Sequence, residues 1–123
     1  MKKKITHKEL KKIFKREIYF FMDYFSLKNF EIIFEDSDDK DIRASTLADE
    51  QNKIVIFNIS TNWANELGNG EEEIKRVAFH EVMEVLFAPI RDKMSAFYSF
   101  EITDEIIHSK IVLFENVVLP LIK

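Results

Sequence analysis

The sequence contains no cysteine, and it has only two glycines and two prolines among its 123 residues. Without cysteine, disulfide bonds and thiolate metal sites are excluded, so any metal ligands must be histidines or carboxylates. So little glycine and proline leaves hardly any material for a flexible linker, and the length is that of one domain. We therefore expect residues 1–123 to form a single domain.

Long apolar runs are also missing. No stretch reaches the roughly 18 or more apolar residues that a membrane-spanning helix needs. The lysine-rich start is followed by Glu9, Glu17 and Asp23, and not by the uncharged segment of a signal peptide. These absences predict a cytoplasmic protein that does not contact a membrane.

The charge is unevenly distributed along the chain. The formal net charge is −4, yet residues 1–16 hold eight of the 18 lysines and arginines and only one acidic residue, Glu9. Such a basic segment could contact nucleic acid, or it could be the solvated face of a helix. The second interpretation is favoured because basic and aromatic residues do not interleave elsewhere in the chain. A nucleic-acid partner is therefore not expected.

The spacing of apolar residues predicts the first half of the fold. Apolar residues three and four positions apart predict a helix over residues 6–25, with Thr6 as its cap. Short segments rich in β-branched and aromatic residues predict a sheet of about three strands over residues 30–60. The last of these strands is the apolar run Ile54–Ile59.

Two more helices are predicted in the second half. One covers residues 70–88, with Asn69 as a possible cap and Pro89 as the residue that ends or bends it. The last covers residues 103–119 and begins at Thr103. The order α-β-β-β-α-α predicts an α+β fold in which a small, mostly antiparallel sheet packs on helices.

The helix over residues 70–88 contains the segment "HEVME", residues 80–84. At about 100° per residue, His80 and Glu84 lie about 40° apart on the helix, whereas Glu81 falls on the apolar face, between Val77 and Ile74. A carboxylate on a buried face is costly unless it is paired, neutralised or used in chemistry. Glu81 is therefore a strong candidate for a functional residue.

The same spacing is typical of a metal site. Residues i and i+4 of one helix can bind one ion, and a carboxylate between them can take a proton from water. This pattern predicts His80 and Glu84 as metal ligands and Glu81 as the catalytic base. It is compatible with zinc and also with iron or manganese.

The last predicted helix offers a third ligand. His108 shares one side of that helix with Asp104 and Glu115. His108 could complete the metal site, and Glu115 could orient an imidazole ring by accepting a hydrogen bond from the ring nitrogen that does not bind the metal. Alternatively, His108 could be an interhelical histidine that is hydrogen-bonded to Asp104 or Glu115.

Three segments resemble the minimal zincin-like metallopeptidases, especially short zincin-like proteins encoded by phages. They are "ASTLADEQNKIVIFNIS", "RVAFHEVMEVLF" and "DEIIHSKIVLFENVV", and the resemblance covers about residues 44–119. It implies a compact zincin-like domain in which His80 is the first zinc ligand, Glu81 the general base and Glu84 the replacement of a second histidine. His108 and Glu115 correspond to the histidine and glutamate of the last helix.

The resemblance also implies a function. It predicts a zinc-dependent hydrolase of the peptidase type, whose extended peptide substrate pairs with strand Ile54–Ile59 as a sheet edge. The substitution at Glu84 supports an alternative, because an added negative charge reduces the ability of a metal to acidify water. In that alternative the chain is a catalytically inactive zincin-fold protein, such as a phage accessory or structural protein, that acts through protein binding.

Overall fold

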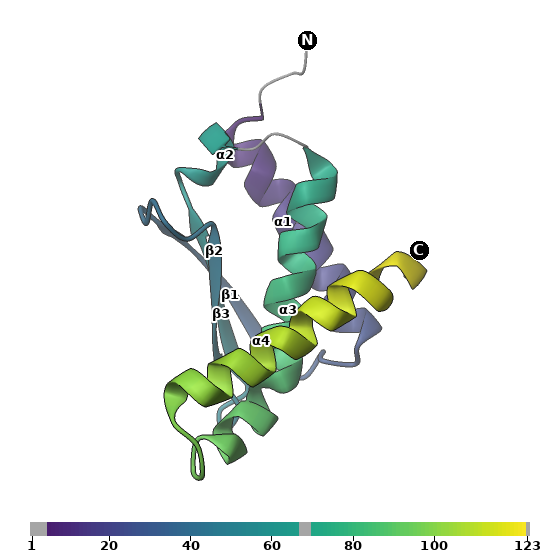
Figure 1. Ribbon diagram of the computed structural model, residues 1–123. Coiled ribbons are helices and arrows are strands. Elements are labelled where there is room, and N and C mark those ends of the chain that lie inside the picture. The colour runs from purple at the N-terminus through teal and green to yellow at the C-terminus, as the bar shows by residue number, and fades with distance from the viewer. Residues whose placement is uncertain (1–4, 67–69, 123) are drawn as a thin grey trace.

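The computed structural model of the protein describes residues 5–66 and 70–122 (Figure 1). It confirms an α+β fold with a three-stranded sheet and four helices in this part of the chain. The helices are α1 (His7–Tyr24), α2 (Trp63–Glu66), α3 (Glu71–Met94) and α4 (Phe100–Val117). The strands are β1 (Glu31–Ser37), β2 (Ala44–Asp49) and β3 (Ile54–Ser60), and the single 3-10 turn Leu119–Leu121 follows α4. The short helix α2 was not predicted from the sequence.

Helix α1 begins as its sequence predicts. The Thr6 hydroxyl group accepts a hydrogen bond from the Glu9 amide at 3.1 Å, and the Glu9 carboxylate accepts one from the Thr6 amide at 3.4 Å. This reciprocal capping satisfies two amide groups that a helix start leaves without partners. The apolar face of the helix is buried in the core through Leu10, Phe14, Ile18, Phe21 and Met22.

The sheet has the order β1-β3-β2, with β1 parallel and β2 antiparallel to β3. It is therefore a mixed sheet, and the prediction of a mostly antiparallel one was wrong. The prediction that Ile54–Ile59 forms a sheet edge was also wrong, because β3 is the central strand. Its alternate residues Val55, Phe57 and Ile59 are fully buried and the others are half-buried or more, which suits a strand with neighbours on both sides.

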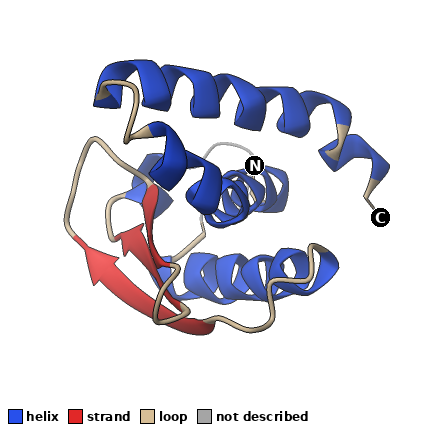
Figure 2. Cartoon of the chain, turned by 90° about the horizontal axis from the view of Figure 1, so that it is seen from below, coloured by secondary structure: helices blue, strands red, loops and turns tan. Residues whose placement is uncertain are grey.

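The helices α1 and α3 cover the same face of the sheet, and α4 crosses α3 on the side away from α1 (Figures 1 and 2). Helix α1 packs on β1 and β3 through Phe14, whose ring meets the rings of Phe34 and Phe57 edge-on, each at 6.5 Å. Helix α3 packs against the edge strand β2. The candidate site residues of α3 therefore lie between β2 and α4.

Both helices of the second half differ from their predicted ranges. Helix α3 continues through Pro89 to Met94, so Pro89 does not end it. The pyrrolidine ring is on the exposed side of the helix, where it costs one intrahelical hydrogen bond without disturbing the core. Helix α4 starts three residues before Thr103, because Ser99 caps it by accepting a hydrogen bond from the Ile102 amide.

The start of α3 also differs. Gly70 occupies the cap position with φ of 62°, a conformation that glycine adopts more readily than other residues. The predicted cap, Asn69, lies outside the described residues. Across residues 5–66 and 70–122, no helix combines the length and hydropathy needed to cross a bilayer.

We expect the substitution Pro89→Ala to stabilise the protein. Alanine would restore the hydrogen bond to the Val85 carbonyl group that proline cannot donate. The gain should be about 1–2 kcal/mol, less than the full helix-interior penalty of proline, because proline also restricts the unfolded chain. Chemical denaturation measures the change, with Lys93→Ala in the same region as the control. Unchanged or lower stability of Pro89→Ala would contradict the prediction.

Candidate functional site

A cleft of about 570 Å³ lies between α3, α4 and the segment that leads into β2. Four of the six residues singled out from the sequence line it: His80, Glu81, His108 and Glu115. Glu84 and Asp104 do not. Of the predicted residues, the cleft thus brings together two imidazoles and two carboxyl groups from two helices, and the carboxyl groups of Asp41 and Glu73 also line it.

Glu81 is buried at the wall of this cleft, with an exposed fraction of 7%. The Thr46 hydroxyl group, on β2, donates a hydrogen bond to Glu81 Oε1 at 2.8 Å and also lies 3.2 Å from the Glu81 carbonyl oxygen. Burial raises the pKa of Glu81 from 4.5 to about 7, while the hydrogen bond from Thr46 acts in the opposite direction. The carboxyl group can therefore gain or lose a proton near neutral pH, as a general base must.

His80 is oriented by a carboxylate from α4. Its Nδ1 lies 2.5 Å from Glu115 Oε1, and Glu115 is buried. A carboxylate in this position accepts a hydrogen bond from Nδ1–H. In the neutral ring, Nε2 is then free to accept a hydrogen bond or to bind a metal. Glu115 was predicted to orient an imidazole, and the ring that it contacts is that of His80.

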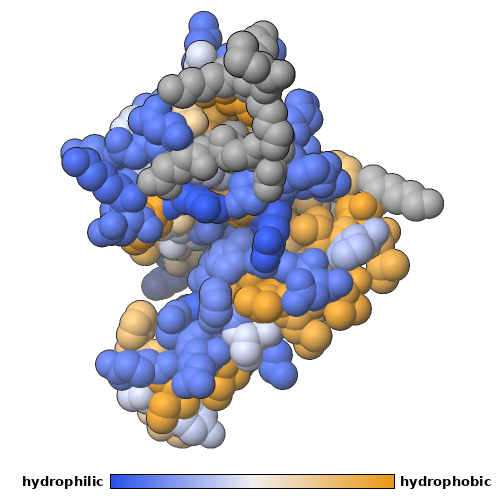
Figure 3. Space-filling model, turned by 45° about the horizontal axis from the view of Figure 1, so that its top comes forward, coloured by the Kyte–Doolittle hydropathy of each residue, from blue (hydrophilic) through white to orange (hydrophobic). Residues whose placement is uncertain are grey.

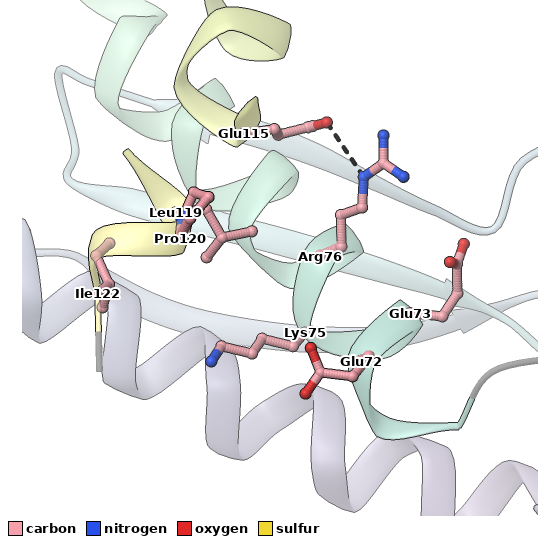
Figure 4. A pocket seen from close by; sticks show the side chains of 8 residues that line it. All are labelled: Glu72, Glu73, Lys75, Arg76, Glu115, Leu119, Pro120 and Ile122. Carbon is pink, nitrogen blue, oxygen red and sulfur yellow. Dashed lines mark ion pairs between the residues drawn. The ribbon is translucent and has the colours of Figure 1, made fainter. Parts of the chain in front are cut away.

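Arg76 forms an ion pair with the second carboxylate oxygen of Glu115. Its Nε lies 3.5 Å from Glu115 Oε2, and Figure 4 shows the two side chains facing one another. The pair borders both the cleft and a second hollow of about 520 Å³ near Leu119 and Pro120. Because Glu115 contacts a cation as well as His80, its negative charge is partly neutralised at the back of the cleft.

His108 lies beside His80. Their ring centroids are 5.5 Å apart with a tilt of 56°, so α4 presents one imidazole next to the other. In the described part of the chain, neither Asp104 nor Glu115 is hydrogen-bonded to His108. Glu115 contacts His80 and Arg76, and Asp104 contacts Arg91. The alternative of an interhelical histidine bonded to one of these carboxylates therefore does not hold.

Glu84, one helical turn after His80 on α3, and Asp104, on α4, lie outside the cleft. The Arg91 guanidinium group donates hydrogen bonds to Glu84 at 3.2 and 3.4 Å and to Asp104 at 2.9 Å. These residues line a separate hollow of about 330 Å³, together with Thr46 and Leu47. Glu84 is therefore engaged by a cation of its own helix and does not line the cleft.

The predicted metal ligands are thus only partly brought together. Within residues 5–66 and 70–122, no three histidine, aspartate or glutamate side chains are arranged to hold one ion. The cleft nevertheless supplies two adjacent imidazoles, which are suitable donors for zinc and other divalent transition metals. Metal binding by His80 and His108 stays a prediction.

The sequence analysis did not predict Thr46 and Arg91, which contact the candidate site residues Glu81 and Glu84. Thr46 gives no strong signal, because a threonine in a strand is common and its partner is 35 residues away. Arg91 gives a clearer one, since it is seven residues after Glu84 and therefore on the same helix face. It was missed because the helix was expected to end or bend at Pro89.

No family model, curated protein or solved structure matches this chain. The resemblance to zincin-like metallopeptidases therefore rests on the three sequence segments that suggested it. Evidence for a function therefore comes from the geometry of the cleft.

The raised pKa of Glu81 predicts a pH-dependent stability of the metal-free protein. The folded state holds this proton more tightly than the unfolded chain does. Stability from this group is therefore fully present below pH 4.5 and decreases as the pH rises through about 7. The variant Glu81→Gln lacks this loss. Relative to this variant, the free energy of unfolding of the wild type should decrease by about 2 kcal/mol between roughly pH 5.5 and pH 8.

Urea denaturation in the presence of a chelator measures this difference. The exposed Glu72 on the same helix provides the control, because the pH curve of Glu72→Gln should run parallel to that of the wild type. Parallel curves for the wild type and Glu81→Gln would show that Glu81 does not titrate as described.

Proposed function

We propose that the cleft is the active site of a metal-dependent hydrolase that cleaves peptide bonds. The observation that carries this proposal is the convergence of His80, Glu81 and His108 on one cleft. A buried carboxyl group beside two imidazoles from different helices is an arrangement that a hydrolase can use and that stability alone does not require.

His80 and His108 are the residues that would hold the metal, with zinc as the expected ion. The contact between His80 Nδ1 and Glu115 supports this role, because a carboxylate behind a histidine is a common way to orient a metal ligand. When bound, a divalent ion supplies Lewis-acid chemistry, in that it lowers the pKa of water and polarises a carbonyl group. Glu84 is not included, because Arg91 engages both of its carboxylate oxygens.

Glu81 acts as the general base in this proposal. Its carboxylate takes a proton from the attacking water and returns it to the leaving amine. Thr46 holds Oε1 at 2.8 Å, which restricts rotation of the carboxyl group and keeps it at the cleft. The apolar face of α3 surrounds the rest of the side chain and excludes bulk water from it.

An extended peptide would pair with strand β2. This strand is an edge of the sheet, whereas β3 has strands on both sides. Ala44, the first residue of β2, lines the cleft, and Thr46, two residues later, contacts Glu81. A peptide that adds to this edge through backbone hydrogen bonds therefore passes close to the proposed base.

A second candidate is peptide binding without cleavage. The ion pair between Glu84 and Arg91 favours it, because two imidazoles alone are one protein ligand fewer than catalytic zinc sites usually have. In this case the β2 edge and the cleft would bind an extended segment of a partner protein. The two candidates differ in whether the bound peptide is cut.

We expect Glu81→Gln to reduce peptide hydrolysis by about 100-fold or more, the usual range for loss of a general base. Glutamine keeps the shape of the side chain but cannot accept the proton. The measurement is mass-spectrometric detection of cleavage in a peptide library with added zinc. Glu84→Gln, one helical turn away and outside the cleft, is the matched control and should retain most activity.

The wild-type protein decides between the two candidates. Absence of cleavage with zinc, manganese, iron and cobalt would contradict the hydrolase. If peptides then still bind and protect β2 from hydrogen exchange, the binding function holds instead.

Zinc titration tests the ligands separately from activity. His108→Ala should abolish stoichiometric zinc binding. Glu115→Gln should weaken it by about 10–100-fold, because the carboxylate behind His80 is lost. Glu84→Gln should leave the affinity unchanged. These affinities can be measured by isothermal titration calorimetry. A loss for Glu84→Gln as large as that for His108→Ala would restore Glu84 to the ligand set and contradict the assignment.

A further inference from the structure

Helix α4 carries apolar residues on two opposite sides. Its inner side packs against α3 through the buried residues Ile107 and Ile111. Its outer side exposes Ile102, Ile106, Leu113 and Val117, with exposed fractions from 38% for Ile106 to 55% for Val117. We call these four residues the outer stripe. In Figure 3, hydrophobic side chains gather near the C-terminal end of the chain.

Three residues of the outer stripe, Ile102, Ile106 and Leu113, fall on the positions of a coiled-coil seam, whose other two positions are the polar Ser109 and Asn116, and Val117 lies beside it at an e position. Ile102, Ile106, Ser109, Leu113 and Asn116 follow one another at alternating intervals of four and three residues. In heptad terms Ile106 and Leu113 occupy a positions, and Ile102, Ser109 and Asn116 occupy d positions. Single exposed apolar residues are normal on protein surfaces, but four of them aligned on one side of a helix indicate a partner.

Charged residues flank the stripe and indicate which partner fits. Glu105 lies on one side, at a g position, and Lys110 lies on the other, at an e position. Both side chains are exposed, and neither forms an ion pair with another residue in the described ranges. In a parallel pair of identical helices, the g position of one helix meets the e position five residues later on the other. Glu105 of each copy would then face Lys110 of its partner.

An antiparallel pair fits less well. In an antiparallel pair centred on Ser109, Lys110 of one copy would lie close to Lys110 of the other, and the two positive charges would repel. The parallel arrangement gives two equivalent attractive pairs, as a closed two-fold interface requires.

We propose that the outer stripe of α4 binds a second copy of this chain, with the two α4 helices parallel around a two-fold axis. The cleft stays open in this dimer, because His108 and Glu115 lie about 140–160° around the helix from Leu113. The inference is therefore independent of the proposed hydrolase, and either one can fail without the other.

Sedimentation equilibrium over a wide range of protein concentrations tests the dimer. The wild type should associate to a dimer, and Ile106→Glu should weaken the association by at least roughly 100-fold, since each copy would then bury a charge in the seam. Ile90→Glu is the matched control, because Ile90 is equally apolar and 50% exposed but belongs to α3. Circular dichroism confirms that both variants fold. A wild type that stays monomeric, or equal weakening by Ile90→Glu, would overturn the proposal.

Charge reversal and cysteine cross-linking test the orientation. Glu105→Lys and Lys110→Glu should each weaken the dimer by roughly tenfold, and the double variant should recover the wild-type affinity. Because the chain has no cysteine, Ile102→Cys introduces a single thiol, which in a parallel dimer lies next to its own copy. A disulfide-linked dimer of this variant supports the proposal. Cross-linking only between Ile102→Cys and Asn116→Cys chains, or no recovery in the double variant, overturns the parallel arrangement.

Discussion

The hydrogen bond from Thr46 to the buried carboxyl group of Glu81 links the edge strand β2 to α3 at the wall of the cleft. A carboxyl group in this position would be costly to bury without a donor, because its ionised form loses hydration. Thr46 offsets part of that cost, and protonation near neutral pH offsets more of it. The wall of the cleft and the acid-base behaviour of Glu81 thus depend on the same contact.

Two ion-pair clusters lie at successive turns along the contact between α3 and α4. Glu115 binds His80 at the cleft, and Arg91 binds Glu84 and Asp104 outside it. Phe87 of α3 and Phe114 of α4 also pack edge-to-face, with ring centroids 5.4 Å apart. Together these contacts fix the rotation of α4 about its axis. That rotation places His108 beside His80 and turns the outer stripe toward solvent.

The sequence was sufficient to predict what depends on local periodicity. The α+β class, the capping of α1 by Thr6 and the burial of Glu81 are all confirmed. Strand order was not predictable in the same way, since the edge position of Ile54–Ile59 came from the resemblance and the strand itself is the most buried of the three. The partner of Glu84 was missed because Arg91 lies beyond Pro89, where local rules favour a break in the helix. Contacts between distant residues, such as that between Thr46 and Glu81, depend on packing that periodicity does not encode.

The proposed function requires His80 and His108 to act together on one ion while Glu81 lies next to them. Nitrogen-detected NMR of the imidazole rings during zinc addition tests it most directly, because the chain has only three histidines and His7 serves as an internal control. We expect the resonances of one ring nitrogen of His80 and one of His108 to shift together at one equivalent of zinc, while those of His7 are unchanged. Shifts of only one of the two rings, or of neither, would contradict it.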